Sequence, residues 1–289
     1  MSGQVRIADL LSEGMKALGA AGIEAPAREA RLLLGLAAKV PPAVMIGFPE
    51  RSVESEAAAA YRSLIARRAD REPVSHLIGE REFWSLPFVV SRDVLDPRPD
   101  SEALIEAVLA EIPDRAAPLR VLDLGTGSGC LLLTLLRELP QAHGWAVDLS
   151  PAALDIARRN AERLGLAERV TFREGAWVAA LAAEDPSNFD LIVSNPPYIP
   201  AAEIAGLEPE VARHEPRLAL DGGEDGLDAY RALAPMLRTR LAPTGLAALE
   251  IGLGQAESVT GLMTAAGMVP SGRQADLARR TRCLLFRTV

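Results

Sequence analysis

The chain has 289 residues, a formal charge of −8 and hydrophobic residues at 49% of its positions. This length suits a large domain with a smaller partner domain. The acidic balance opposes the phosphate attraction that drives nucleic-acid binding, and the apolar residues form no run of the roughly 18 to 20 that a membrane span needs.

The amino-terminal part of the chain predicts a small helical domain. Apolar residues recur at helical spacing from Val5 to Leu18, and two more helical stretches cover residues 27–38 and 54–69. Prolines stand between these stretches, as they do at helix starts and breaks. The start, Met1 to Leu10, lacks the basic-then-apolar order of a signal peptide, so we expect a soluble, cytoplasmic protein.

A segment with strand-forming residues follows the helical part and predicts a connection between two domains. Residues 82–90 are rich in aromatic and β-branched side chains, which favour a short strand or hairpin. Further on, Ser101 can cap a helix that continues through Glu111. We therefore expect a helical domain at 1–75, a linker or hairpin at 76–97, and a larger domain at 98–289.

After residue 119, short apolar strands alternate with helices. The predicted strands are Arg120–Asp123, Gly144–Asp148, Val170–Phe172, Phe189–Ser194 and Leu246–Ile251. Among the predicted helices are Cys130–Glu138, Pro151–Leu164 and Leu227–Leu241. Continuous apolar strands in this alternation predict an α/β domain, with a parallel sheet that helices cover on both faces.

A glycine-rich loop, V-L-D-L-G-T-G-S-G-C, lies between the first of these strands and the first helix. Gly125, Gly127 and Gly129 allow the backbone to turn sharply and to approach a ligand closely. Asp148 ends the next strand, where a carboxylate can accept hydrogen bonds from both ribose hydroxyls of a nucleoside. The alternative for Asp148 is a helix cap, for which Ser150 and Pro151 are better placed.

The spacing of this loop distinguishes two kinds of cofactor. A dinucleotide site has the pattern G-x-G-x-x-G and holds a pyrophosphate at a helix N-terminus, whereas the pattern here is D-x-G-x-G-x-G. Asp123 near the loop would repel a pyrophosphate, but S-adenosylmethionine has no phosphate and presents an ammonium and a sulfonium. We therefore expect S-adenosylmethionine. A nicotinamide cofactor and a purely structural turn are the alternatives.

The fourth strand leads directly into Asn195, Pro196, Pro197 and Tyr198, beyond the carboxyl edge where such sheets bind ligands. An amide nitrogen is a poor nucleophile because its lone pair is delocalised, so it must be held and polarised. The Asn195 side-chain oxygen and the Pro196 carbonyl can each accept one of its N–H groups, while Tyr198 can stack on the amide plane. This motif predicts methylation of a planar amide or amine nitrogen. The alternative is a proline-rich strand exit.

Cysteine and histidine provide no sign of a metal site. Cys130 and Cys283 lie far apart and fit neither a disulfide framework nor a zinc spacing, so we expect both to be small buried residues. The three histidines, His76, His143 and His214, are isolated in the sequence and form no metal-ligand pair.

Six longer segments resemble those of a known family. They are Pro73–Trp84, Pro97–Glu102, the glycine loop at 121–129, Asn195–Pro200, His214–Tyr230 and Leu249–Gln255. On these segments the chain resembles the HemK/PrmC family, the protein-(glutamine-N5) methyltransferases. The resemblance implies a Rossmann-like, class I S-adenosylmethionine-dependent methyltransferase fold, with a seven-stranded, mostly parallel sheet and a small amino-terminal helical domain.

The resemblance also implies the roles of individual residues. The methyl donor would be held by Gly125, Thr126, Gly127, Ser128 and Gly129, by Asp148 at the ribose, by Trp177 near the adenine, and by Asn195. The glutamine clamp would be Asn195, Pro196, Pro197 and Tyr198, of which Asn195, Pro196 and Tyr198 are the expected catalytic positions. The substrate would be the glutamine of a Gly-Gly-Gln loop in a class 1 peptide-chain release factor, which the helical domain helps to grip.

The chain departs from the family pattern in three places. Asp100-Ser101 stands where the family has Glu-Thr, which keeps the carboxylate and the hydroxyl. The segment Asp276–Arg282 reads D-L-A-R-R-T-R in place of D-L-A-G-R-D-R. Trp177 lacks the acidic neighbour that is common beside it, so its role is the least specific of those implied.

Two other functions remain as alternatives. A nucleic-acid methyltransferase that modifies adenine N6 or guanine N2 would present a similar planar nitrogen to the same motif, but such enzymes add a basic groove or a recognition domain. A non-catalytic, cofactor-binding interaction protein is the other alternative. We expect a monomer that binds a release factor and has no nucleic-acid or membrane partner.

Overall fold

The structure, a computed structural model, describes residues 5–288 and divides into two units. One unit contains the described residues up to Gly79 together with Glu208–His214. The other contains Glu80–Leu207 and the described residues from Glu215 onward. The domain boundaries expected after residues 75 and 97 remain predictions.

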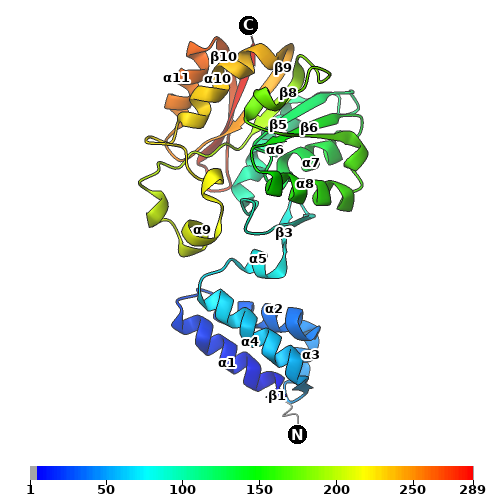
Figure 1. Cartoon of the computed structure of the whole chain (residues 1–289), viewed down its shortest axis with the longest axis vertical. Helices are drawn as coiled ribbons and strands as arrows, with labels where there is room; N and C mark the ends of the chain where they lie inside the picture. The colour runs from blue at the N-terminus through cyan, green and yellow to red at the C-terminus, as the bar shows by residue number, and fades with distance from the viewer. Residues whose placement is uncertain (1–4, 289) are drawn as a thin grey trace. The chain divides into compact units, whose positions relative to one another are not determined.

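The first unit is helical, as the sequence predicts (Figure 1). Its helices are α1 Ile7–Ala20, α2 Pro26–Ala38, α3 Pro42–Gly47, α4 Ser55–Ala69, α5 Val74–Ile78 and α9 Pro209–His214. Two short strands, β1 Val5–Arg6 and β2 Ser52–Val53, pair antiparallel. The first helix therefore begins at Ile7 and not at Val5, because the preceding residues are held by β2.

Helices α1 and α4 pack closely around Gly14. A Cβ at Gly14 would lie 1.9 Å from the Tyr61 hydroxyl oxygen, whereas a Cβ at Gly19 of the same helix would have nothing within 4 Å. We expect Gly14→Ala to lower the free energy of unfolding by roughly 1–3 kcal/mol through overpacking. Gly19→Ala should raise it by up to about 1 kcal/mol, because alanine has the higher helix propensity. Urea unfolding of both variants, followed by circular dichroism, measures the difference; the same stabilisation in both would contradict the close contact.

Helix α9 joins this unit through ion pairs with a buried arginine. Arg68 is only 6% exposed, and its guanidinium donates to Glu29 Oε2 at 2.6 Å and to Glu210 Oε1 at 3.0 Å. Arg71 donates to the other oxygen of Glu210 at 2.8 Å. The segment Glu208–His214 is thereby fixed to helices that precede it by about 140 residues, a connection that local sequence patterns do not reveal.

The second unit is built on a seven-stranded sheet with the strand order β10-β11-β9-β8-β5-β6-β7. Its strands are β5 Arg120–Leu124, β6 His143–Asp148, β7 Val170–Glu174, β8 Phe189–Ser194, β9 Leu241–Glu250, β10 Met268–Ala275 and β11 Thr281–Thr288. Strands β5 to β9 are parallel, and β11 runs antiparallel to both of its neighbours. The predicted α/β fold with a seven-stranded, mostly parallel sheet is confirmed.

Five longer helices accompany this sheet: α6 Glu102–Glu111, α7 Cys130–Glu138, α8 Pro151–Arg163, α10 Asp228–Arg240 and α11 Ala256–Ala265. A hairpin of β3 Glu80–Phe83 and β4 Leu86–Val89 precedes them. The predicted helices agree with these bounds to within one residue at each end. Among residues 5–288, no helix is long and apolar enough to cross a membrane.

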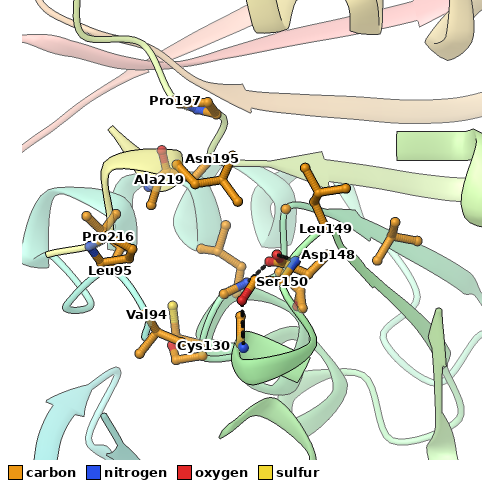
Figure 2. A pocket seen from close by; sticks show the side chains of 18 of the residues that line it. Val94, Leu95, Cys130, Asp148, Leu149, Ser150, Asn195, Pro197, Pro216 and Ala219 are labelled. Atoms are coloured by element: carbon orange, nitrogen blue, oxygen red, sulfur yellow. Dashed lines mark hydrogen bonds between the residues drawn. The ribbon is translucent and has the colours of Figure 1, made fainter. Parts of the chain in front are cut away.

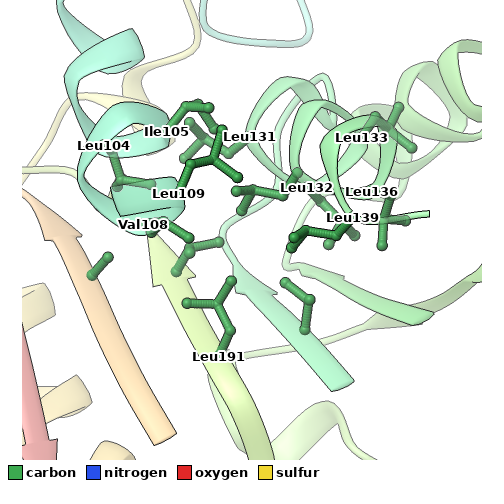
Figure 3. Close-up of a cluster of buried hydrophobic side chains, with 14 of the residues drawn as sticks. Leu104, Ile105, Val108, Leu109, Leu131, Leu132, Leu133, Leu136, Leu139 and Leu191 are labelled. Carbon is green, nitrogen blue, oxygen red and sulfur yellow. The ribbon is translucent and has the colours of Figure 1, made fainter. Parts of the chain in front are cut away.

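Alternate residues of the central strands are buried in two different cores. Val121 and Leu191 belong to a cluster with leucines of α6 and α7, which Figure 3 shows. Leu122 and Ile192 belong to a second cluster, with residues of α10 and α11. Figure 1 shows these two groups of helices on opposite faces of the sheet. Because both faces are covered, the central strands are mostly apolar and their carboxyl ends provide the accessible edge.

Candidate functional site

A cavity of about 350 Å³ opens at the carboxyl ends of β5, β6 and β8. Figure 2 shows Asp148, Leu149 and Ser150 on one side, Leu95, Pro216 and Ala219 on the other, and Asn195 between them. All the residues that line it lie in the second unit. Most of its surface is apolar, with few polar groups, which is typical of a small-molecule site.

The glycine loop adopts the conformation that the sequence predicts. Gly125, Gly127 and Gly129 have φ angles of 77°, 55° and 81°, which are costly for residues with a Cβ. The backbone N–H groups of Gly125 and Thr126 both donate to the carbonyl of Val147, at 2.9 and 3.0 Å. The loop is therefore fixed against the end of β6, with residues 125–128 in the cavity wall.

Asp148 connects this loop to the next helix. One carboxylate oxygen accepts from Gly127 N at 2.8 Å, and the other accepts from Ser150 N at 2.9 Å. The side chain of Ser150, not that of Asp148, caps α8 by accepting from Ala153 N, with Pro151 in the first turn, as the sequence predicts. Burial raises the pKa of Asp148, and the backbone N–H donors oppose that shift.

Asp123 does not act as the sequence argument assumed. Its side chain is fully buried and accepts from Thr126 Oγ1 at 2.6 Å, and it does not line the cavity. Burial raises its pKa to about 7. The Asp123 carboxylate holds the loop through Thr126, does not reach the cavity, and is only partly ionised at neutral pH. Its repulsion of a pyrophosphate is therefore the wrong reason for excluding a dinucleotide.

Asn160 of α8 is a buried structural residue that the sequence analysis missed. Its side chain accepts from Val89 N at 2.7 Å and donates to the carbonyls of Val89 and Ser128, at 3.0 and 2.8 Å. It thus ties the glycine loop to the hairpin strand β4. The available signal was an amide among the apolar residues of an amphipathic helix, next to Ala157 and Ala161.

Trp177 also lines the cavity, at the start of a short 3-10 turn, Trp177–Ala180. Its own φ is 51°, an unusual value for a bulky residue. A Cβ on Gly125 would lie 3.8 Å from the Trp177 ring, so the ring lies next to the glycine loop. A position beside the loop is compatible with the predicted contact to a cofactor base, which remains a prediction.

The four residues after β8 do not all face the cavity. Asn195 and Pro197 line it, whereas Pro196 and Tyr198 are not among its lining residues. The Tyr198 hydroxyl points to Glu250 Oε1 at 3.5 Å, and burial raises the pKa of the phenol. Its predicted stacking on a substrate amide remains a prediction.

The backbone of this motif is held by a glutamine after β9. Gln255 Nε2 donates to the carbonyl of Tyr198 at 2.9 Å, and Gln255 Oε1 accepts from Gly252 N at 2.9 Å. The motif is therefore attached to the end of β9 as well as to that of β8. Such rigidity suits a group that has to position a substrate.

Ser101 corrects another expectation. It stands at the N-cap of α6, as predicted, but its side chain makes no capping hydrogen bond. Its oxygen instead accepts from Asn195 Nδ2 at 3.4 Å. Ser101 is 3% exposed and lines the cavity, which places it in the candidate site.

The two cysteines differ from each other. Cys283 is buried, as expected, but Cys130 is half-buried and lines the cavity. The expectation that both are buried was wrong for Cys130, because the helix that it begins starts at the cavity wall. Burial nevertheless raises the pKa of its thiol to about 12, so the thiolate is scarce at neutral pH.

The chain is similar in sequence to release factor glutamine methyltransferases. Residues 9–79 match the family described as PrmC N-terminal domain, and residues 80–209 match the methyltransferase small domain. A release factor glutamine methyltransferase from Rhodospirillum rubrum is 50% identical over 96% of this chain and 84% of its own length. One from Cereibacter sphaeroides is 49% identical over 98% of this chain and 99% of its own.

A solved structure shows a similar fold at low identity. The methyltransferase from Pyrococcus furiosus has a TM-score of 0.52 and 16% identity, and the match covers 78% of this chain and 99% of that one. At this identity the likeness concerns the fold alone.

Proposed function

The chain belongs to the family of release factor glutamine methyltransferases, and we propose that it transfers a methyl group from S-adenosyl-L-methionine to glutamine N5 in the Gly-Gly-Gln motif of class 1 release factors. The observation that carries this proposal is the identity of about half of all residues over nearly the whole chain, helical unit included. A shared methyltransferase fold alone would leave the substrate open.

The cavity residues fit the proposed methyl donor. Nothing lies within 4 Å of a Cβ built on Gly127, so the loop leaves room for a ligand at that point. The Asp148 carboxylate, which accepts from the loop at Gly127 N, has acceptor sites left for ribose hydroxyls besides those that its two backbone donors use. Trp177 would contact the adenine. When bound, the cofactor supplies an electrophilic methyl group on a sulfonium.

The residues after β8 would hold the nucleophile. The Asn195 side-chain oxygen would accept one N–H of the substrate amide and the Pro196 carbonyl the other, which orients the nitrogen lone pair. Proline at 196 and 197 keeps this backbone rigid, and Tyr198 would pack beside the amide. Asn195, Pro196 and Tyr198 are thus the proposed catalytic positions. Catalysis would come mainly from positioning and polarisation, because the amide proton can leave after the nitrogen has become cationic.

The partner in this proposal is a protein. We propose that the helical unit contributes to gripping the release factor, that the enzyme acts as a monomer in the cytoplasm, and that it needs no direct nucleic-acid or membrane contact. The formal charge of −8 supports a protein over a nucleic acid as the substrate.

A labelling experiment tests the substrate. We expect purified protein with methyl-labelled cofactor to label a class 1 release factor, and a Gln→Ala change in its Gly-Gly-Gln loop to abolish the label. The same reaction with tRNA and with duplex DNA serves as the comparison and should incorporate none. Label that persists on the Gln→Ala factor, or that enters nucleic acid instead, would overturn the assignment.

A further inference from the structure

Three polar side chains from separate elements meet at the wall of the cavity. They are Ser101 just before α6, Asn195 after β8, and Glu250 at the end of β9. Ser101 and Glu250 are 3% and 2% exposed. Ser101 and Asn195 line the cavity, whereas Glu250 does not. Burying polar groups costs free energy unless they form hydrogen bonds. Which atom donates and which accepts in each of these hydrogen bonds is therefore informative.

The hydrogen bonds of this group have a definite direction. Asn195 Nδ2 donates to Ser101 Oγ at 3.4 Å, so the serine oxygen is the acceptor. The hydroxyl proton of Ser101 then needs an acceptor of its own, and the nearby carboxylate is that of Glu250, whose pKa the Ser101 side chain lowers. An ionised carboxylate can only accept, so it forces the serine to donate to it and to keep its lone pairs for Asn195.

This direction decides which end of the Asn195 amide is offered to a ligand. With Nδ2 bound to Ser101, the acceptor Oδ1 is the end left for a substrate N–H. The flipped amide would oppose its own NH₂ to the NH₂ of the substrate, and two donors cannot pair. We propose that Ser101 and Glu250 are positioning residues that hold the Asn195 amide with its oxygen toward the substrate nitrogen, an inference that rests on the proposed function.

Glu250 is surrounded by groups from several elements. Facing it are Asp100 and Ser101 before α6, Cys130 of α7, Tyr198 after β8, Tyr230 of α10, and Arg282 and Cys283 of β11. Burial raises the pKa of Glu250 to about 7, although hydrogen bonding to Ser101 and the charge of Arg282 oppose it. Its second oxygen, Oε2, has no hydrogen-bond partner among the described residues.

Protonation of Glu250 would therefore weaken the hold of Ser101 on the Asn195 amide. Below about pH 7 the carboxyl carries a proton that it can donate to Ser101 Oγ, and the serine hydroxyl can then turn toward Asn195. Turnover should rise as the pH increases through this range, because ionisation restores the productive orientation. Asp123 has a pKa in the same range, so only a change at Glu250 assigns the step.

Activity on the release factor tests the proposal. We expect Ser101→Ala to lower kcat roughly tenfold, the effect of losing one buried hydrogen bond, while KM and cofactor affinity change by less than about twofold. Ser101→Thr, which keeps the hydroxyl, should retain the activity. Glu250→Gln conserves the volume but does not titrate, so the rise of kcat around pH 7 should disappear. In an Asn195→Ala background, Ser101→Ala should cause no further loss.

A second measurement does not depend on methyl transfer. The asparagines of the chain are Asn160, Asn188 and Asn195, so protein labelled with ¹⁵N at asparagine side chains gives few amide signals to assign. Ser101→Ala and Glu250→Gln should shift the two side-chain N–H signals of Asn195 and leave those of Asn160 and Asn188 in place. Ser101→Thr, which keeps the hydroxyl, should leave the Asn195 signals near their wild-type positions.

The outcomes separate this proposal from the function itself. A wild-type protein that labels no release factor overturns the proposed function, and the amide spectra then decide the positioning role alone. A wild-type protein that labels the factor, with Ser101→Ala at unchanged kcat and an unmoved Asn195 signal, overturns the positioning role and leaves the function standing. A loss in Ser101→Ala that Ser101→Thr does not restore, or that adds fully to Asn195→Ala, also contradicts it.

Discussion

Replacing Asn195 by alanine should reduce kcat on the release factor by ~10²-fold or more while cofactor affinity stays nearly unchanged, the scale of losing one key polarising group. The residue lies at the cavity wall after β8, and its amide is held by Ser101 at 3.4 Å. Alanine removes the acceptor for one substrate N–H and leaves the glycine loop and Asp148 untouched. Steady-state kinetics together with calorimetric titration of S-adenosylmethionine separate the two effects.

The control for this variant is Asn188→Ala. Asn188 does not line the cavity and accepts a hydrogen bond from its neighbour Ser187 at 3.3 Å, so kcat should remain near the wild-type value. If Asn195→Ala loses cofactor affinity to the same extent as turnover, then Asn195 serves mainly to bind the cofactor, and the polarising role is misassigned.

The parts of the fold that could be predicted from sequence depend on local burial. The central parallel strands β5 and β8 are buried on both faces, so they show as apolar runs, and helices α7 and α8 begin after the glycine loop and at a proline. Strand β9 begins at Leu241, five residues before the predicted start, because exposed Pro243 and Thr244 interrupt its apolar pattern. The edge strand β10 is mostly exposed and carries little signal of its own.

The parts that could not be predicted depend on contacts between distant residues. Nothing near Glu210 indicates that its helix belongs with Arg68, because their ion pair joins segments 142 residues apart. Ser101 reads as a helix cap from its neighbours alone, and only the fold brings it to Asn195, 94 residues later. The site residues recognisable in sequence lie on continuous loops, while those that orient them come from other elements.

Replacing Asp148 by alanine should weaken S-adenosylmethionine binding by roughly 10²-fold, because a carboxylate that accepts several hydrogen bonds contributes about 1.5–3 kcal/mol through each. The variant frees Gly127 N and Ser150 N, which the carboxylate now holds at 2.8 and 2.9 Å, and removes the proposed acceptor for the ribose hydroxyls. At saturating cofactor, kcat should recover most of its value, the opposite of the Asn195→Ala pattern. Calorimetry with S-adenosylmethionine, and kinetics at varied cofactor concentration, measure both quantities.

Asp93→Ala is the matched control, because Asp93 is another carboxylate that lines the cavity, bound by the hydroxyl of Ser91 at 3.0 Å. The cofactor carries an ammonium and a sulfonium, so any negative charge at the cavity could attract it. If attraction alone held the cofactor, the two alanine variants would weaken binding equally. If Asp148 acts through directed hydrogen bonds, Asp93→Ala should change affinity by less than about threefold, and Asp148→Asn, which keeps one acceptor oxygen, should lie between wild type and Asp148→Ala. Equal losses at positions 93 and 148 would show that the carboxylate at the end of β6 has no special part in holding the ribose.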